Sequence, residues 1–274
     1  MRIISLQPSV SIILDRLGCL DSLAACTKYC VEAVPALGTR SLPIVHDSWS
    51  TKAAELLPVP ADLVIASVPY RTESLTAILQ SGRPALTLAP RTLADVYQDI
   101  RLIASVVQAS LRGEALIAEM QSQIEEVRHR ASAAGIKPRV YCEEWGKPLI
   151  HSQLWVSELV EAAGGEFIGT PGATTEAEAI AGADPDVVVA AWCGAGDRVP
   201  LERIVQQRGW QDLRAVRCGR VCCIADELLN TPAPTLIGGL YALAQAIHPD
   251  IFGSLQNPSG RNIDLNSIAA SKLM

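Results

Sequence analysis

The chain has 274 residues, of which 49% are hydrophobic and 19% charged, enough for one large or two medium globular domains. Its net charge of −6, without a run of lysine or arginine, argues against nucleic acid or an anionic membrane surface as a partner. No stretch of about 18 apolar residues occurs, so direct membrane insertion is not expected.

The chain opens with "MRIISLQPS", where a strand-like segment follows Met1 without a basic region, an apolar region or a cleavage site. As written, this indicates a cytoplasmic protein, or a periplasmic one if a signal peptide has been removed. The eight cysteines have no C-x-x-C or paired spacing, which argues against zinc-finger and thioredoxin-like sites. Most of them are expected to be small buried core residues.

The first third of the chain alternates short apolar segments with helical patterns, which is typical of a parallel α/β sheet. One helix should open at Pro8 and end before Gly18, and a second should cover about residues 72–79. The expected strands are residues 2–6, 23–27, 62–67 and 85–89.

From about Thr92 to Ala134 the apolar residues recur every three or four positions, with one gap of six around Gly113. If continuous, this helix would be roughly 60 Å long, more than a crossover within one small sheet needs. Gly135 and Pro138 then end the helical pattern. A second series of strands is expected at residues 139–144, 186–192 and 220–225.

The predicted fold is α/β, with two Rossmann-like lobes that have parallel sheets, a long backbone helix joining them and a ligand cleft between the lobes. The expected parts are an N-terminal lobe (1–91), an inter-lobe helix (92–136), a C-terminal lobe (137–252) and a flexible tail (253–274).

The loops that follow the strands should line this cleft, because ligands bind outside the carboxyl ends of parallel strands. Aromatic rings there suit a broad planar ligand, although tryptophans at loop starts can also cap the core. Trp155 and Trp210, in or beside helices, are expected in the core. The predicted ligand-binding residues are Tyr29, Cys30, Trp49, Tyr70, Arg71, Glu143, Trp145, Trp192, Cys193 and Asn230.

Catalytic motifs are missing from the sequence, so an enzyme is not expected. Glu143 and Glu144 are adjacent on a strand and should point to opposite faces, which prevents them from acting as an acid/base pair. An enzyme with Cys30 or Cys193 as nucleophile is the least favoured alternative, because no paired base is visible. No metal site or required cofactor is predicted; weak candidates for metal ligands are His46 and His151.

Seven segments resemble the helical-backbone class of substrate-binding proteins of ABC importers. The similarity is closest to the cobalamin-binding branch, together with its relatives that lack a signal peptide. The matching segments run in order from residue 2 to residue 249, nearly the whole chain. They are "RIISLQPSVSIILDRLG", "ADLVIAS", "EEWGKPL" with "WVSELVEAAGGEFIG", "DPDVVVAAWCG", "RGWQDLRAVRCGRV" and "APTLIGGLYALAQAIHP".

This resemblance implies a non-enzymatic solute-binding protein that binds a corrinoid or related metal chelate for ABC import. It places Trp145 of "EEWG", Tyr29 and Trp49 at aromatic ligand-contact positions. Glu73 and Glu178 resemble the two glutamates that dock on the importer's membrane subunits. Acidic residues are also common at solvent-exposed helix starts, so docking is not the only interpretation of these two.

Two departures from the family pattern concern ligand identity. Thr235 stands in "APTL" where relatives usually have the arginine of "GPRL", and Lys28 replaces a histidine common in close relatives. Cobalamin, haem, a ferric siderophore and a small metal complex all stay open as ligands. The sequence also leaves open a cytosolic carrier or sensor of corrinoid, haem or metal chelate that has no transporter.

Overall fold

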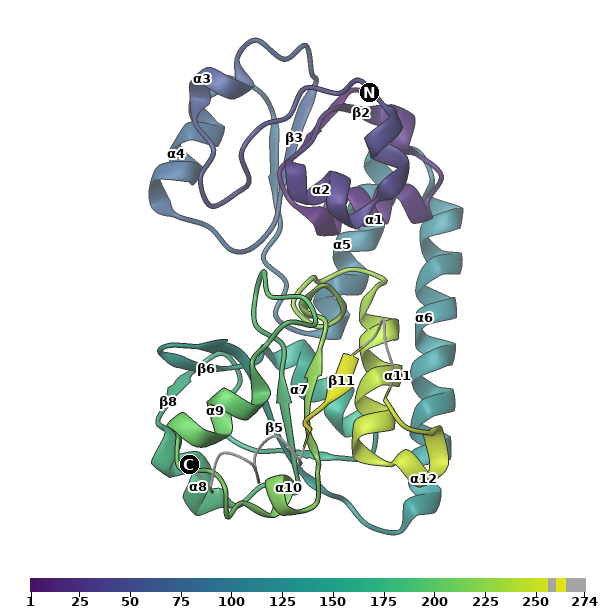
Figure 1. Cartoon of the computed structure of the whole chain (residues 1–274). Helices are drawn as coiled ribbons and strands as arrows, with labels where there is room; N and C mark the ends of the chain where they lie inside the picture. Colours follow the sequence, from purple (N-terminus) through teal and green to yellow (C-terminus); the bar gives the residue numbers. More distant parts are fainter. Residues whose placement is uncertain (256–259, 265–274) are drawn as a thin grey trace. The chain divides into compact units, whose positions relative to one another are not determined.

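A computed structural model of the chain describes residues 1–255 and 260–264 (Figure 1). Contacts divide them into unit 1, residues 1–120 and 232–234, and unit 2, residues 121–231 and the described residues from 235 onward. Much of the predicted tail (253–274) lies outside the described residues. None of the helices in the described ranges is long and apolar enough to cross a membrane.

Unit 1 contains a parallel sheet with the strand order β2-β1-β3-β4, and all four predicted strand segments take part in it. Its elements are β1 (Ile3–Ser5), α1 (Pro8–Arg16), η1 (Leu20–Ser22), β2 (Leu23–Ala25), α2 (Lys28–Ala33), η2 (Pro35–Thr39), α3 (Ala53–Leu56), β3 (Leu63–Ala66), α4 (Thr72–Gln80), β4 (Ala85–Thr87), α5 (Leu93–Val106) and the first part of α6 (Ser110–Ala131).

One face of this sheet is a hydrophobic core under α3 and α4. Alternate residues of β1 and β3, including Ile4 and Val64, are fully buried there against Leu56 and Ile78. Helix α1 starts with Pro8 as predicted, and Gly18 ends it with φ +63°. Short parallel strands with buried faces therefore fix the carboxyl edge of the sheet, where the loops begin.

Unit 2 contains a mixed sheet, which corrects the prediction of a parallel one. Strands β5, β9 and β10 run parallel, but β6, β8 and β11 pair antiparallel with their neighbours. Its elements are the rest of α6, η3 (Ser132–Ala134), β5 (Arg139–Gly146), β6 (Leu149–His151), α7 (Leu154–Ala162), β7 (Glu166–Phe167), β8 (Thr174–Thr175), α8 (Ala177–Ala183), β9 (Val187–Ala190), α9 (Leu201–Gln207), α10 (Arg214–Arg217), β10 (Val221–Ile224), η4 (Asp226–Leu228), α11 (Leu236–Ile247), α12 (Pro249–Phe252) and β11 (Gly260–Asn262).

The core of unit 2 forms on both faces of its sheet. Tyr141 and Val188 point to the face covered by α8, α9 and α10 and pack in one cluster with Trp210. Helix α11 contacts β10 and α7. Trp155 and Trp210 are 3% and 1% exposed, so both are core residues as predicted.

The predicted long helix is interrupted and forms α5 and α6. Gln108 has φ +56°, and the N–H of Ala109 donates to the carbonyl of Ala104, a bonding pattern that ends helices. Gly113 of α6 lies against Ala104 with no room for a Cβ. The sequence pattern does not predict this break, because glutamine rather than glycine or proline takes the left-handed position.

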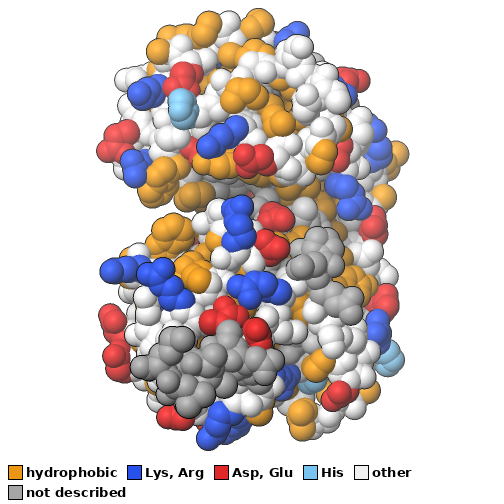
Figure 2. Space-filling view, in the orientation of Figure 1, with side chains coloured by type: hydrophobic (Ala, Val, Ile, Leu, Met, Phe, Trp, Pro, Cys, Tyr) orange, Lys and Arg blue, Asp and Glu red, His pale blue; other side chains and the backbone are white. Residues whose placement is uncertain are grey.

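The surface carries no large patch of one charge on the face drawn in Figure 2. Lysine and arginine side chains are interspersed there with aspartate and glutamate. This distribution agrees with the modest net charge of −6.

Candidate functional site

The carboxyl edge of the unit 2 sheet gathers the predicted residues at the end of β5 and in the loops after β9 and β10. The Nδ2 of Asn230 donates to the carbonyl of Ala191 at 2.7 Å and to the Sγ of Cys193 at 3.3 Å. The Nε1 of Trp192 donates to Glu143 at 2.7 Å. Parallel strands put their carboxyl ends at one edge, so residues far apart in the chain become neighbours.

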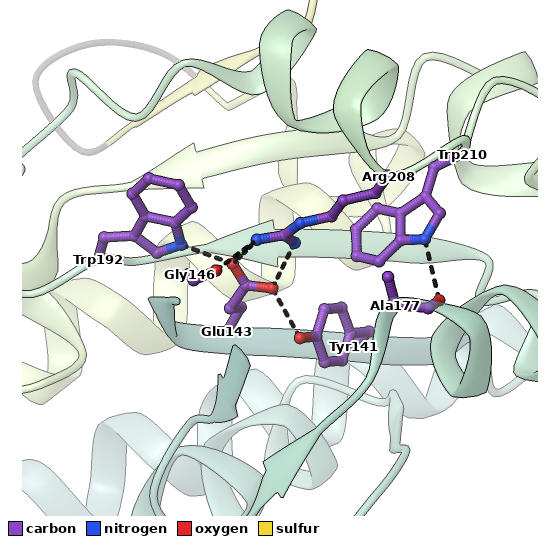
Figure 3. Close-up of polar contacts among 7 residues, drawn as sticks. All are labelled: Tyr141, Glu143, Gly146, Ala177, Trp192, Arg208 and Trp210. Atoms are coloured by element: carbon purple, nitrogen blue, oxygen red, sulfur yellow. Dashed lines mark hydrogen bonds and ion pairs between the residues drawn. The ribbon is translucent and has the colours of Figure 1, made fainter. Parts of the chain in front are cut away.

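A buried ion pair lies beneath this edge (Figure 3). Nη1 and Nη2 of Arg208 lie 2.7 and 2.9 Å from the two carboxylate oxygens of Glu143, a bidentate geometry. The hydroxyl of Tyr141 donates to the same carboxylate at 2.7 Å. Nη2 of Arg208 also donates to the carbonyl of Gly146 at 3.2 Å.

Glu143 was predicted to contact the ligand, but in this structure its carboxylate has no capacity left for one. The residue is 1% exposed, and donors from Arg208, Tyr141 and Trp192 occupy four acceptor positions. Glu143 therefore supports the edge from below. Sequence reasoning missed Arg208, which lies 65 residues from Glu143 in the chain, and no spacing signal connects the two.

The two tryptophans of this edge are held differently. Trp145 is 44% exposed, and its Nε1 donates to the carbonyl of Lys147. Trp192 is half-buried, with its ring against the backbone of Gly146, where no Cβ would fit. Trp145 therefore presents an open face on the β5–β6 hairpin, while Trp192 is bonded to Glu143 of β5 and packs on the backbone of Gly146.

Cys193 lies in a loop that carboxylates surround. Its Sγ is 3.9 Å from Glu144, and Asp226 accepts hydrogen bonds from the backbone N–H groups of Gly194 and Gly196, each at 2.8 Å. Desolvation and the charges of Glu144 and Asp226 raise the pKa of Cys193 to about 12. This disfavours the thiolate, which speaks against Cys193 as a nucleophile.

The carboxyl edge of the unit 1 sheet presents two exposed aromatic rings, each with a cation over it. The guanidinium of Arg71 lies 4.4 Å from the ring centroid of Trp49, and the Nζ of Lys28 lies 4.7 Å from that of Tyr29. Tyr29 and Trp49 are 43% and 41% exposed. The hydroxyl of Ser74 donates to the carbonyl of Trp49 at 2.7 Å, which ties this loop to α4.

Cys30 and Tyr70, also predicted to bind the ligand, are less available. Cys30 is fully buried, with its Sγ 3.2 Å from the hydroxyl of Thr27. The hydroxyl of Tyr70 donates to the carbonyl of Leu88 at 2.9 Å, and burial raises the pKa of Tyr70. Of the five residues predicted in unit 1, Tyr29, Trp49 and Arg71 are exposed, Tyr70 is half-buried and Cys30 is buried.

The weak metal candidates lie in unrelated surroundings. His46 is exposed, with its Nδ1 2.8 Å from Glu55. His151 is 3% exposed, stacks edge-on against Tyr141, and has its pKa lowered by burial. Across residues 1–255 and 260–264, no group of three or more histidine, cysteine, aspartate or glutamate side chains could hold a metal ion.

The two glutamates predicted to dock on a transporter are exposed, one in each unit. Glu73 is in the first turn of α4, and Glu178 is in the first turn of α8. Their placement fits either docking or the ordinary preference of acidic residues for helix starts.

Comparison with known proteins adds independent information. The family described as periplasmic binding protein matches residues 3–228. An uncharacterized ABC transporter substrate-binding lipoprotein, YvrC of Bacillus subtilis, is 25% identical over 263 residues, which cover 92% of this chain and 81% of the relative. A cobalamin-binding protein of Halobacterium salinarum is 22% identical over 258 residues, covering 90% of this chain and 69% of the relative.

Solved structures share the fold. A periplasmic heme-binding protein from Pseudomonas aeruginosa superposes with a TM-score of 0.83 at 21% identity, covering 96% of this chain and 98% of the other. The periplasmic vitamin B12 binding protein BtuF of Vibrio cholerae gives a TM-score of 0.72 at 21% identity, covering 90% and 96%. At these identities, the similarity establishes the architecture only.

Proposed function

The chain belongs to the periplasmic binding protein family, whose members are solute-binding proteins rather than enzymes, and we propose that it binds a corrinoid or a related planar metal chelate. The observation that carries this proposal is the set of half-exposed aromatic rings at the carboxyl edges of the two sheets. Tyr29 and Trp49 belong to unit 1, and Trp145 belongs to unit 2.

Aromatic faces at these edges suit a broad flat ligand. A ring that is already exposed and fixed by its loop loses little side-chain entropy when it stacks on a macrocycle. Trp49 is tied to α4 through Ser74, and Trp145 is tied to its own hairpin through Lys147. A small hydrophilic solute would leave such rings in contact with water, so the rings favour a macrocycle.

The relatives support this class of ligand and differ within it. The Halobacterium salinarum relative is named for cobalamin, and two of the similar structures are named for heme and vitamin B12. We place the corrinoid first because the similarity extends over 90% of the chain to a cobalamin-binding protein. No bound cofactor is required for this activity.

We further propose that the protein delivers its ligand to an ABC importer, in which case it acts outside the cytoplasm. The similarity to a substrate-binding lipoprotein of an ABC transporter supports this proposal. Glu73 and Glu178 are then the docking residues, because each is an exposed carboxylate at a helix start and each unit has one. The Glu73→Ala/Glu178→Ala double variant tests docking. It should lose transport and retain ligand binding, and unchanged transport would contradict the docking role.

The ligand proposal is tested by titrating the purified protein with hydroxocobalamin and, separately, with haemin. Tryptophan quenching and the visible spectrum of the probe are followed together. We expect saturable quenching by hydroxocobalamin. Saturation by haemin alone would replace the corrinoid with a haem-type ligand, and no saturation by either probe would overturn the planar-chelate proposal.

Two variants locate the binding surface. Trp49→Ala and Trp145→Ala should each weaken probe binding by roughly thirtyfold, the effect of truncating a central aromatic contact. Leu79→Ala is the control, because Leu79 is a 72% exposed apolar residue near the end of α4, away from the carboxyl edge. Equal effects of all three substitutions would contradict the assignment.

A further inference from the structure

The ion pair between Arg208 and Glu143 is buried and has further hydrogen-bond partners in other parts of unit 2. Its side chains are 10% and 2% exposed, and it joins three parts of unit 2: β5, which carries both Glu143 and Gly146, the loop of Trp192 and the end of α9. Buried ion pairs add little net stability compared with apolar side chains of the same volume. Their gain lies in fixed geometry, which a site for a rigid ligand needs.

We infer that Arg208 and Glu143 are positioning residues that hold Trp192 in the orientation in which it meets the ligand, without touching the ligand themselves. This inference rests on the proposed function. It assigns a role to Arg208, and it changes the expected role of Glu143 from contact to support.

The hydrogen bonds define the position of the Trp192 ring from two sides. Its Nε1 donates to Oε1 of Glu143 at 2.7 Å, and that oxygen also accepts from Nη2 of Arg208 at 2.9 Å. The same Nη2 donates to the carbonyl of Gly146, against whose backbone the indole ring packs. The guanidinium of Arg208 therefore fixes both the carboxylate that accepts from the indole N–H and the Gly146 backbone on which the indole ring packs.

Arg208 is itself held in place. It is the C-terminal cap residue of α9, and its guanidinium lies 4.8 Å from the ring centroid of Trp210, whose Nε1 donates to the carbonyl of Ala177 at 3.1 Å (Figure 3). The planar fork of arginine can bond both carboxylate oxygens and a carbonyl at once, which the single ammonium of lysine cannot reproduce. Arg208→Lys therefore keeps the positive charge and removes the bidentate contact with Glu143.

The first test needs no ligand. In a proton–nitrogen correlation spectrum of the whole protein, Trp192→Phe identifies the indole N–H signal of Trp192. We expect Arg208→Lys and Glu143→Gln to shift this signal and to speed its exchange with water. Unchanged shift and exchange in both folded variants would overturn the inference, whatever ligand the protein binds.

The second test measures affinity for hydroxocobalamin and haemin. Arg208→Lys and Trp192→Phe, which keeps an aromatic ring but loses the indole donor, should each weaken binding of a saturating probe roughly tenfold, as loss of an outer support does at other sites. The control is Arg214→Lys, which alters an ion pair of the same unit with Asp186, before the amino end of β9.

The outcomes separate positioning from general stability. Leu159→Ala creates a cavity in the buried part of α7. It should lower the unfolding temperature while leaving probe affinity within about twofold of the wild type. If it weakens binding as much as Arg208→Lys, the ion pair has only a structural role and the inference fails. If neither probe binds, the proposed ligand class fails, and the indole signal still decides whether the ion pair positions Trp192.

Discussion

The two units present aromatic rings at their carboxyl edges in opposite ways. In unit 2, Trp192 is fixed by a buried bidentate ion pair, whereas in unit 1 Trp49 and Tyr29 lie beneath exposed cations. An exposed cation over a ring keeps much of its rotamer freedom, while a buried fork has one geometry. Under the proposed function, the support of Trp192 in unit 2 is preorganised, whereas the cations over the unit 1 rings are adjustable.

Removing one partner of the buried pair should have the largest effect on stability. Glu143→Leu leaves the guanidinium of Arg208 buried without a counter-charge, which should lower the free energy of unfolding by about 3–5 kcal/mol. The Glu143→Leu/Arg208→Met double variant should recover most of this loss. Thermal and urea unfolding of the whole protein measure both effects, and a double variant less stable than Glu143→Leu would contradict this account.

A buried carboxylate in unit 1 offers a contrast with Glu143. Burial, with a smaller contribution from Asp95, raises the pKa of Asp99 to about 7. Because the pKa of an unfolded aspartate is about 3.9, the stability contribution of Asp99 is complete below that pH and is lost as the pH rises toward 7.

Asp99→Asn removes this pH dependence. The free energy of unfolding of the variant minus that of the wild type should increase with pH. This difference should be roughly 2 kcal/mol larger at pH 8 than at pH 5. Urea unfolding at the two pH values measures the difference. The same stability difference at both would show that Asp99 is ionised in the folded protein throughout this range.

The smallest effect is expected at the exposed cation of unit 1. Arg71→Gln removes the cation over Trp49 and should weaken probe binding roughly two- to fivefold, with little change in stability. Arg2→Gln, an exposed residue before the amino end of β1, is the matched control. A loss as large as that of Arg208→Lys would contradict this difference between the two units.

The sequence alone determined most of the secondary structure and the core. Apolar strands between helical patterns identified all four strands of unit 1 and strands β5, β9 and β10, and the context of Trp155 and Trp210 marked them as buried. These features depend on local periodicity and on burial of apolar area, both of which can be read within a short window. The antiparallel strands β6, β8 and β11 and the break at Gln108 have weaker local signals and were missed.

Only the tertiary structure decided which of the candidate site residues are buried and which are exposed. Glu143 and Trp145 are two residues apart on one strand, yet one is buried under four hydrogen bonds and the other is 44% exposed. The difference comes from Arg208, which is 65 residues from Glu143 and reaches it because α9 packs on that face of the sheet. Sequence spacing cannot encode such a contact, because it depends on how separate elements pack once the chain has folded.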